Sequence, residues 1–361
     1  MSRCSVTLYC DATQLFILEI FKKLPVMKVR ILSIDGGGIR GIIPAVILDY
    51  IEKGLQRQAG NDPNVTLADY FDFVAGTSTG GILACYCLMP PEAGQKLHSR
   101  HTAEEAVRMY EKHGAAIFDS KVMRKGITKP KYKADGLEKV LKECLGDVTL
   151  AQSRKNCLVT AYDITARKAV LFTSPEAREH RQRDYFLRDV ARATSAAPTY
   201  FEPAKATSMA NAASYLIDGA MYAGNPAMCA VVEAYKTKFD RCPNPKINDL
   251  YIVSVGTGNE HEKVNHNRAK DWGAIGWIRP LIDVLLSASS EVVDYQLRQM
   301  FDIAGCSDCY VRLEPALKLA KPEMDDASKE NIGHLKNDGE RFVRNNVEVL
   351  DKIVKQLRIE N

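Results

Sequence analysis

The sequence lacks several features that would place it in a specialised class of protein. Its 361 residues hold 49 Lys and Arg against 45 Asp and Glu, a formal net charge of only +4. With so little excess of one sign, no overall cationic field is available to bind nucleic acid. No apolar run approaches the roughly 20 residues of a membrane-spanning helix. Internal repeats and low-complexity linkers are also missing, and the 46% hydrophobic content excludes a disordered or collagen-like chain.

The ten cysteines follow no regular spacing, unlike the disulfide framework of a small secreted protein. We therefore expect reduced thiols and a cytoplasmic protein. The N-terminal stretch Leu15–Phe21 is short, contains Glu19 and precedes no small-residue cleavage site, so it is a poor signal peptide. Cys306 and Cys309 have C-x-x-C spacing, but no second Cys/His pair at zinc spacing accompanies them, and we expect no metal site.

Strand-like and helix-like patterns alternate along the chain. An apolar run at 28–35 stops at three glycines, and residues 42–51 then carry apolar side chains at helical spacing. The same unit recurs as a strand at 70–75, a turn at 76–81 and a helix at 82–89. Further strands are predicted at 157–162, 169–173, 214–218 and 250–255, and further helices near 102–113, 135–145, 185–196, 226–239, 279–300 and 338–358. This alternation predicts an α/β fold with a mostly parallel central sheet sandwiched by helices.

The pattern also predicts how the chain is divided. Met27 directly precedes the first clear strand, so residues 1–26 form an N-terminal extension that we expect to be dispensable. Residues 27–361 are expected to form one domain, with 258–335 as a cap or appendage.

Three of the predicted strands end in motifs that carry chemistry, and in such sheets reactive groups lie beyond the carboxyl ends of the strands. Gly76-x-Ser78-x-Gly80 matches the nucleophile elbow, a sharp strand-to-helix turn that exposes a serine between small residues. The alternative interpretation is a tight turn with an ordinary N-cap serine.

The loop Asp35-Gly36-Gly37-Gly38-Ile39-Arg40-Gly41 offers successive backbone N–H groups at the start of a helix, as a developing oxyanion requires. Gly36, Gly38 and Gly41 of the same loop also match the G-x-G-x-x-G motif of dinucleotide-binding proteins. Two observations count against a dinucleotide site. Asp35 would place a carboxylate beside the pyrophosphate of the ligand. The dinucleotide fold also has an acidic residue at the end of a second strand, about 20 residues after the glycine loop, and this sequence has none there. The sequence therefore favours an oxyanion loop over a nucleotide loop.

A serine nucleophile needs a base. The seven histidines lie in charged or polar surroundings without a strand-end pattern, typical of solvated surface residues. Asp218 instead follows the apolar Tyr215-Leu216-Ile217 and precedes Gly219-Ala220. Partial desolvation there would make the carboxylate a better proton acceptor, although a turn-forming aspartate is the plain alternative.

The chain resembles the patatin-like phospholipase family. The resemblance is carried by Asp-Gly-Gly-Gly-Ile-Arg-Gly at 35–41, Gly-Thr-Ser-Thr-Gly at 76–80 and Asp-Gly-Ala at 218–220, and it extends through 191–198 and 254–258. It implies a lipid acyl hydrolase with a Ser-Asp dyad: Ser78 as nucleophile, Asp218 as base, the amides of Gly36, Gly37 and Gly38 as oxyanion hole, and Arg40 steadying that loop. Ala220 stands where many relatives have a second glycine.

The resemblance implies cleavage of fatty-acyl esters of membrane glycerophospholipids without a metal or other cofactor. The protein would then be cytoplasmic and, when active, peripheral to the inner membrane. Some similar bacterial relatives are antiphage effectors activated by cyclic dinucleotides, so such a ligand is a further expectation. The alternatives are a Ser-His-Asp esterase and a non-catalytic lipid-binding or storage protein of the same fold. The oligomeric state is left open.

Two weaker signals concern the membrane. Six basic residues and no acids lie between Lys121 and Lys133, a pattern that fits either contact with anionic lipid or a solvated loop. The stretch Trp272–Trp277 fits a membrane-interface element, an acyl-pocket element or a packed loop.

Overall fold

The computed structural model describes residues 28–118, 129–259, 269–270 and 273–358. Within these ranges eight strands form one mixed sheet in the order β5-β6-β3-β2-β1-β7-β8, with β4 paired to β3. The strands are β1 (Val29–Ile34), β2 (Phe73–Gly76), β3 (Asn156–Asp163), β4 (Lys168–Thr173), β5 (Ala204–Thr207), β6 (Ala213–Asp218), β7 (Leu250–Val255) and β8 (Tyr310–Leu313). The neighbouring strands β3, β2, β1, β7 and β8 are parallel. β4 and β6 pair antiparallel with β3, and β5 pairs antiparallel with β6. The predicted α/β fold with a mostly parallel sheet is confirmed.

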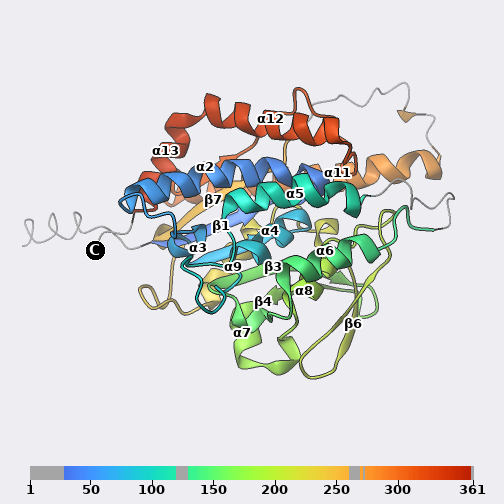
Figure 1. The fold of residues 1–361 in the computed structure, drawn as a ribbon, viewed down its shortest axis with the longest axis horizontal. Helices are drawn as coiled ribbons and strands as arrows, with labels where there is room; N and C mark the ends of the chain where they lie inside the picture. The colour runs from blue at the N-terminus through green and yellow to red at the C-terminus, as the bar shows by residue number, and fades with distance from the viewer. Residues whose placement is uncertain (1–27, 119–128, 260–268, 271–272, 359–361) are drawn as a thin grey trace, which may run out of the picture.

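Helices surround this sheet (Figure 1). They are α2 (Ile42–Gln58), α3 (Leu67–Tyr70), α4 (Thr79–Cys87), α5 (Ala103–Ile117), α6 (Asp135–Leu145), α7 (Ser174–Glu179), α8 (Leu187–Thr194), α9 (Ala227–Lys236), α11 (Ala274–Ile303), α12 (Lys329–Asn345) and α13 (Val347–Gln356). α4 packs against β1, β2 and β3, and α9 against β1, β2 and β7. α12 and α13 lie over α2 at the top of the view in Figure 1.

The central strands form where the sequence is apolar without alternation. β7 is buried along its whole length and β1 is buried except for Arg30, as parallel strands covered by helices on both faces require. Ile31 lies opposite Phe73 on one side and Ile252 on the other. These pairs fix the register that brings the ends of β1 and β2 to the same edge of the sheet.

Several predicted elements need correction. The strand predicted at 70–75 begins only at Phe73, because Thr66 and Asp69 form a capping box that starts the short helix α3. The single helix predicted at 338–358 is two helices, which are interrupted at Asn346. The four-residue strands β5 and β8 were not predicted.

The interval 258–335, which we expected to form a cap or appendage, also contributes to the central sheet. β8 pairs parallel with β7, and α11 packs against both β8 and α9. The expected extension, residues 1–26, lies outside the described residues.

Candidate active site

Ser78 occupies the sharp turn between β2 and α4. Its backbone has φ 54° and ψ −123°, a left-handed conformation that is costly for a residue with a Cβ atom. A Cβ atom on Gly76 would lie 2.2 Å from the carbonyl oxygen of Gly80, and one on Gly80 would lie 2.1 Å from that of Ile34. Both glycines are therefore required for the turn. The Ser78 amide donates to Thr194 Oγ1 over 2.8 Å, which holds the turn from α8.

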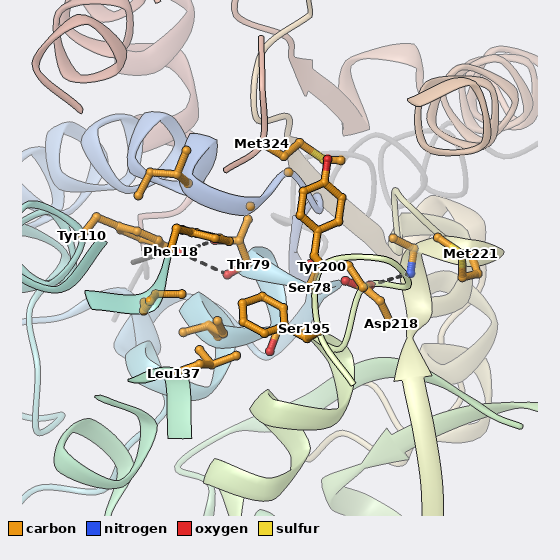
Figure 2. Close-up of a pocket in the computed structure, with 18 residues that line it drawn as sticks. Ser78, Thr79, Tyr110, Phe118, Leu137, Ser195, Tyr200, Asp218, Met221 and Met324 are labelled. Atoms are coloured by element: carbon orange, nitrogen blue, oxygen red, sulfur yellow. Dashed lines mark hydrogen bonds between the residues drawn. The ribbon is translucent and has the colours of Figure 1, made fainter. Parts of the chain in front are cut away.

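Asp218 lies at the end of β6, beside Ser78 (Figure 2). Both side chains are buried, and both line the same pocket. Burial raises the pKa of Asp218 to about 7, although interactions with the neighbouring Ser78 side chain and with the Ala220 amide oppose the shift. The amide donates to Oδ1 over 2.8 Å. The structure thus brings together the two side chains that the sequence selected, and tunes the carboxylate for proton transfer near neutral pH.

The glycine loop that follows β1 lies beside this pair. A Cβ atom on Gly37 would lie 2.2 Å from Thr257 Oγ1, and Gly38 has φ +60° with its missing Cβ facing the Met324 carbonyl. Neither of their amides has a hydrogen-bond acceptor among the described residues, and both glycines line the pocket with Ser78 and Asp218. These two N–H groups are candidates for an oxyanion site.

Gly36 differs from its predicted role. Its amide donates to the Gly224 carbonyl over 3.0 Å, so it anchors the loop and is not available to an oxyanion. Arg40 lies against the same loop, because its guanidinium donates to the carbonyls of Gly37 and Gly258 over 3.4 and 3.2 Å. This position fits the predicted supporting role of Arg40, whose effect on activity stays a prediction.

A buried ion pair that the sequence analysis missed fixes the start of the loop. Arg312, on β8, contacts both carboxylate oxygens of Asp35 over 3.0 and 2.6 Å, and also pairs with Glu314. Burial raises the pKa of Glu314 to about 7, while Arg312 opposes that shift. Ser290 of α11 donates to Asp35 over 3.0 Å. No local pattern marks Arg312, because its partner is 277 positions away.

The pocket above Ser78 has mostly apolar walls. They come from the glycine loop, α4, α5, α6 and the segment after α8 (Figure 2). The apolar residues include Ile39, Ile82, Phe118, Leu137, Phe201 and Met324. Such walls suit a hydrocarbon chain.

No histidine among the described residues lines this pocket. His98 instead contacts Asp69 over 3.1 Å, and the ring of His101 stacks on Tyr86. His261 and His266 lie outside the described residues. Likewise, the described part of the chain holds no group of three or more His, Cys, Asp or Glu side chains arranged to bind a metal ion, and its cysteines are free thiols.

Comparison with known proteins gives one consistent family. The model of the family described as patatin-like phospholipase matches residues 32–231. Patatin-like protein 2 from Oryza sativa subsp. indica is 34% identical over 90% of this chain and 86% of its own length. Patatin-2-Kuras 3 from Solanum tuberosum is 34% identical over 88% and 84%, and probable inactive patatin-3-Kuras 1 from the same plant is 33% identical over 88% and 87%.

Among solved structures, VipD from Legionella pneumophila covers 87% of this chain and 67% of its own, with a TM-score of 0.33 and 14% identity. That likeness is too low to carry an argument, whereas the sequence matches cover nearly the whole chain. The chain belongs to the patatin-like phospholipase family.

Proposed function

We propose that the protein is a serine acyl hydrolase that cleaves fatty-acyl esters of membrane glycerophospholipids through Ser78 and Asp218. The observation that carries this proposal is that a serine in a strained elbow and a buried carboxylate with a raised pKa lie side by side in one mostly apolar pocket (Figure 2). Membership of a family that includes lipid acyl hydrolases supports it.

The first half of the reaction forms an acyl-enzyme. Ser78 Oγ attacks the ester carbonyl carbon while its proton passes to Asp218. The carbonyl oxygen takes up the electron pair, and the amides of Gly37 and Gly38 donate to it. When the intermediate collapses, the bond to the alcohol oxygen breaks, and Asp218 returns the proton to the leaving lysophospholipid.

Water completes the cycle by the same steps. Asp218, again a carboxylate, takes a proton from a water molecule that attacks the acyl-enzyme carbonyl. The second tetrahedral intermediate expels Ser78 Oγ, which recovers the proton, and the fatty acid is released. No histidine is needed, because burial gives Asp218 the proton affinity that an imidazole would otherwise supply.

The proposal is tested by measuring phospholipid hydrolysis by wild type, Ser78→Ala and Asp218→Asn. Wild type should release fatty acid from phospholipid vesicles, and both Ser78→Ala and Asp218→Asn should lose at least 1000-fold (an order-of-magnitude expectation for a broken nucleophile–base pair). A fluorophosphonate probe should label wild type and not Ser78→Ala. Full hydrolysis by Ser78→Ala would refute the assignment.

Two alternatives give different results in the same assays. A Ser-His-Asp esterase would keep activity in Asp218→Asn, show a pH profile tied to one histidine and lose activity on replacement of that histidine. A non-catalytic protein of the same fold is a specific alternative, because one relative is named a probable inactive patatin. Absence of both hydrolysis and probe labelling would support that alternative.

The peripheral membrane contact is proposed to involve α11. Its N-terminal half extends beyond the body of the molecule at the right of Figure 1. Trp277, Leu281, Val284 and Leu285 are between 39% and 49% exposed, and their spacing places them on one helix face. Further along the same helix, Ser289 accepts from the Gly224 amide, so α11 is joined to the loop segments around the pocket. An exposed apolar face of this kind inserts into the surface of a bilayer.

Co-sedimentation with phospholipid vesicles tests this contact. Replacing Leu281 and Leu285 with Glu should reduce the bound fraction at least tenfold, since buried charge opposes insertion. The matched control replaces Val232 on α9 and Val349 on α13 with Glu. These residues are 53% and 42% exposed, close to the values for Leu281 and Leu285, and the control should bind as wild type. Equal loss in both variants would contradict the assignment to α11. Of the basic segment 121–133, Lys121, Arg124 and Lys125 lie outside the described residues, and Lys131 pairs with Asp325.

Activation by a cyclic dinucleotide and a role in antiphage defence stay predictions. The relatives reported above are plant proteins. Hydrolysis measured with and without a panel of cyclic di- and trinucleotides tests the idea, and absence of stimulation by all of them would exclude it.

A further inference from the structure

A second, polar cavity of about 640 Å³ lies at the other edge of the sheet. Its walls come from the start of β1 at Lys28–Arg30, the segment Ser153–Asn156 that leads into β3, and the loop Lys238–Cys242 after α9. The candidate active site lies beyond the opposite ends of β1 and β2. Six steps of extended chain lead from Arg30 to Gly36, a distance of about 20 Å.

The lining of this cavity has an excess of positive charge. Its lining has seven basic side chains and three carboxylates: Lys28, Arg30, Arg154, Lys155, Arg178, Lys238 and Arg241 against Asp69, Asp72 and Asp240. Removing these from the 49 basic and 45 acidic residues of the sequence leaves 42 of each. The lining therefore carries a formal charge of +4, as large as that of the whole chain.

Among the described residues, most of these cations have no carboxylate partner. Arg154 pairs with Asp69. The acceptors that the described residues offer to Arg178 are uncharged: the carbonyls of Ala151, Ser153 and Lys155 and the Asn156 amide oxygen. Among the described residues, no carboxylate forms an ion pair with the other lysines and arginines at the rim, which are Lys155, Lys238 and Arg241. Positive charge is thus left over where it can meet a ligand.

Two guanidinium groups also repel one another across the cavity. Burial lowers the pKa of Arg30, and the positive charge of Arg241 lowers it further, while Asp72 opposes both effects. Within the described ranges, the Arg30 guanidinium donates only to the carbonyl of Arg358, over 3.3 Å. An anion placed between Arg30 and Arg241 would relieve this repulsion, and guanidinium groups bind phosphate oxygens in pairs.

We propose that this cavity binds a soluble anion bearing two or more phosphate groups. The concentration of unpaired cations in a concave site favours several negative charges on one ligand, as in a pyrophosphate or a nucleotide. A lipid headgroup is the less favoured source. A bilayer that presents an acyl ester to Ser78 contacts the opposite end of the sheet, about 20 Å away. The site is separate from the proposed catalytic pair, and only the preference for a soluble anion over a headgroup rests on the proposed function.

Isothermal titration of the 361-residue chain with pyrophosphate tests the proposal. Wild type should bind, and the double variant Lys238→Gln with Arg241→Gln should bind at least tenfold more weakly. The control Arg57→Gln with Lys329→Gln removes the same charge from exposed positions on α2 and α12 and should bind within twofold of wild type. Ser78→Ala should bind unchanged, which separates this result from any failure of the proposed hydrolase.

Three results would overturn the inference. Absence of pyrophosphate binding by wild type would show that the cavity does not accept this class of anion. Equal weakening in the control variant would show that binding follows overall charge and not the cavity. Binding only to vesicles that contain phosphorylated lipid, with none to pyrophosphate, would assign the site to a headgroup. Thermal unfolding of each variant verifies that the exposed substitutions leave the fold intact.

Discussion

Replacing Asp218 with Asn should stabilise the protein, and the gain should grow with pH. Burial raises the pKa of this carboxyl from 3.8 to about 7. At about 1.4 kcal/mol for each pKa unit, the shift is worth roughly 4 kcal/mol of free energy of unfolding. This is the cost of holding an ionised carboxylate in a buried site. A carboxylate kept there for catalysis would set activity against stability.

The sign follows from which state holds the proton more tightly. Below about pH 4 both folded and unfolded chains carry a protonated Asp218, and the shift has no effect. Between pH 4 and 7 the unfolded chain loses the proton first, so the free energy of unfolding falls as pH rises. Above pH 7 the full cost is present. The asparagine of the variant has no titrating proton, and its oxygen can still accept from the Ala220 amide.

Urea denaturation at pH 5 and pH 8 measures the effect. The difference in free energy of unfolding between Asp218→Asn and wild type should be larger at pH 8 by about 3 kcal/mol, from the two pKa units between pH 5 and 7. Asp302→Asn, at an exposed position, controls for removal of one negative charge. A difference that is the same at both pH values would refute the raised pKa, and with it the argument that burial prepares Asp218 as a base.

Three further predictions follow from the same geometry. The kcat/KM for ester hydrolysis should rise with pH and level off above about pH 7, because the free enzyme needs Asp218 as a carboxylate; a profile that is flat between pH 5 and 8 would contradict this role. Gly37→Ala should lower kcat at least 100-fold while the fold is retained, because the added Cβ lies 2.2 Å from Thr257 Oγ1 and displaces an oxyanion donor; near-normal kcat would exclude the Gly37 amide from the reaction. Arg312→Met should lower the free energy of unfolding by about 3–5 kcal/mol, because it leaves Asp35 buried without its partner; a loss below about 1 kcal/mol in urea denaturation would show that the ion pair is dispensable.

Much of the fold followed from local sequence. The central strands β1, β3 and β7 and the helix α6 were predicted close to their observed bounds, because an apolar run or a helical periodicity is a property of neighbouring residues. β5 and β8 were not predicted, since four residues with the patterns AKAT and YVRL carry too little signal. They are strands only because β6 and β7 offer free edges to pair with.

In the candidate site too, local sequence predicted the residues, and the tertiary structure decided their arrangement. The sequence by itself determined Ser78, Asp218 and the glycine loop, because an elbow, a strand-end carboxylate and a run of glycines are each encoded within a few residues. Tertiary structure decided how they meet. β3 extends past the end of β2, and the antiparallel strand β6 runs back along that extension, which places Asp218 opposite Ala161 and beside Ser78.

Tertiary structure alone also decided the burial that shifts the pKa of Asp218, the loss of Gly36 from the oxyanion site, the pairing of Asp35 with Arg312, and the cluster of cations at the opposite edge of the sheet. The physical reason is common to all four. Desolvation, hydrogen-bond partners and charge density depend on which distant segments pack together, and no window of neighbouring residues contains that information.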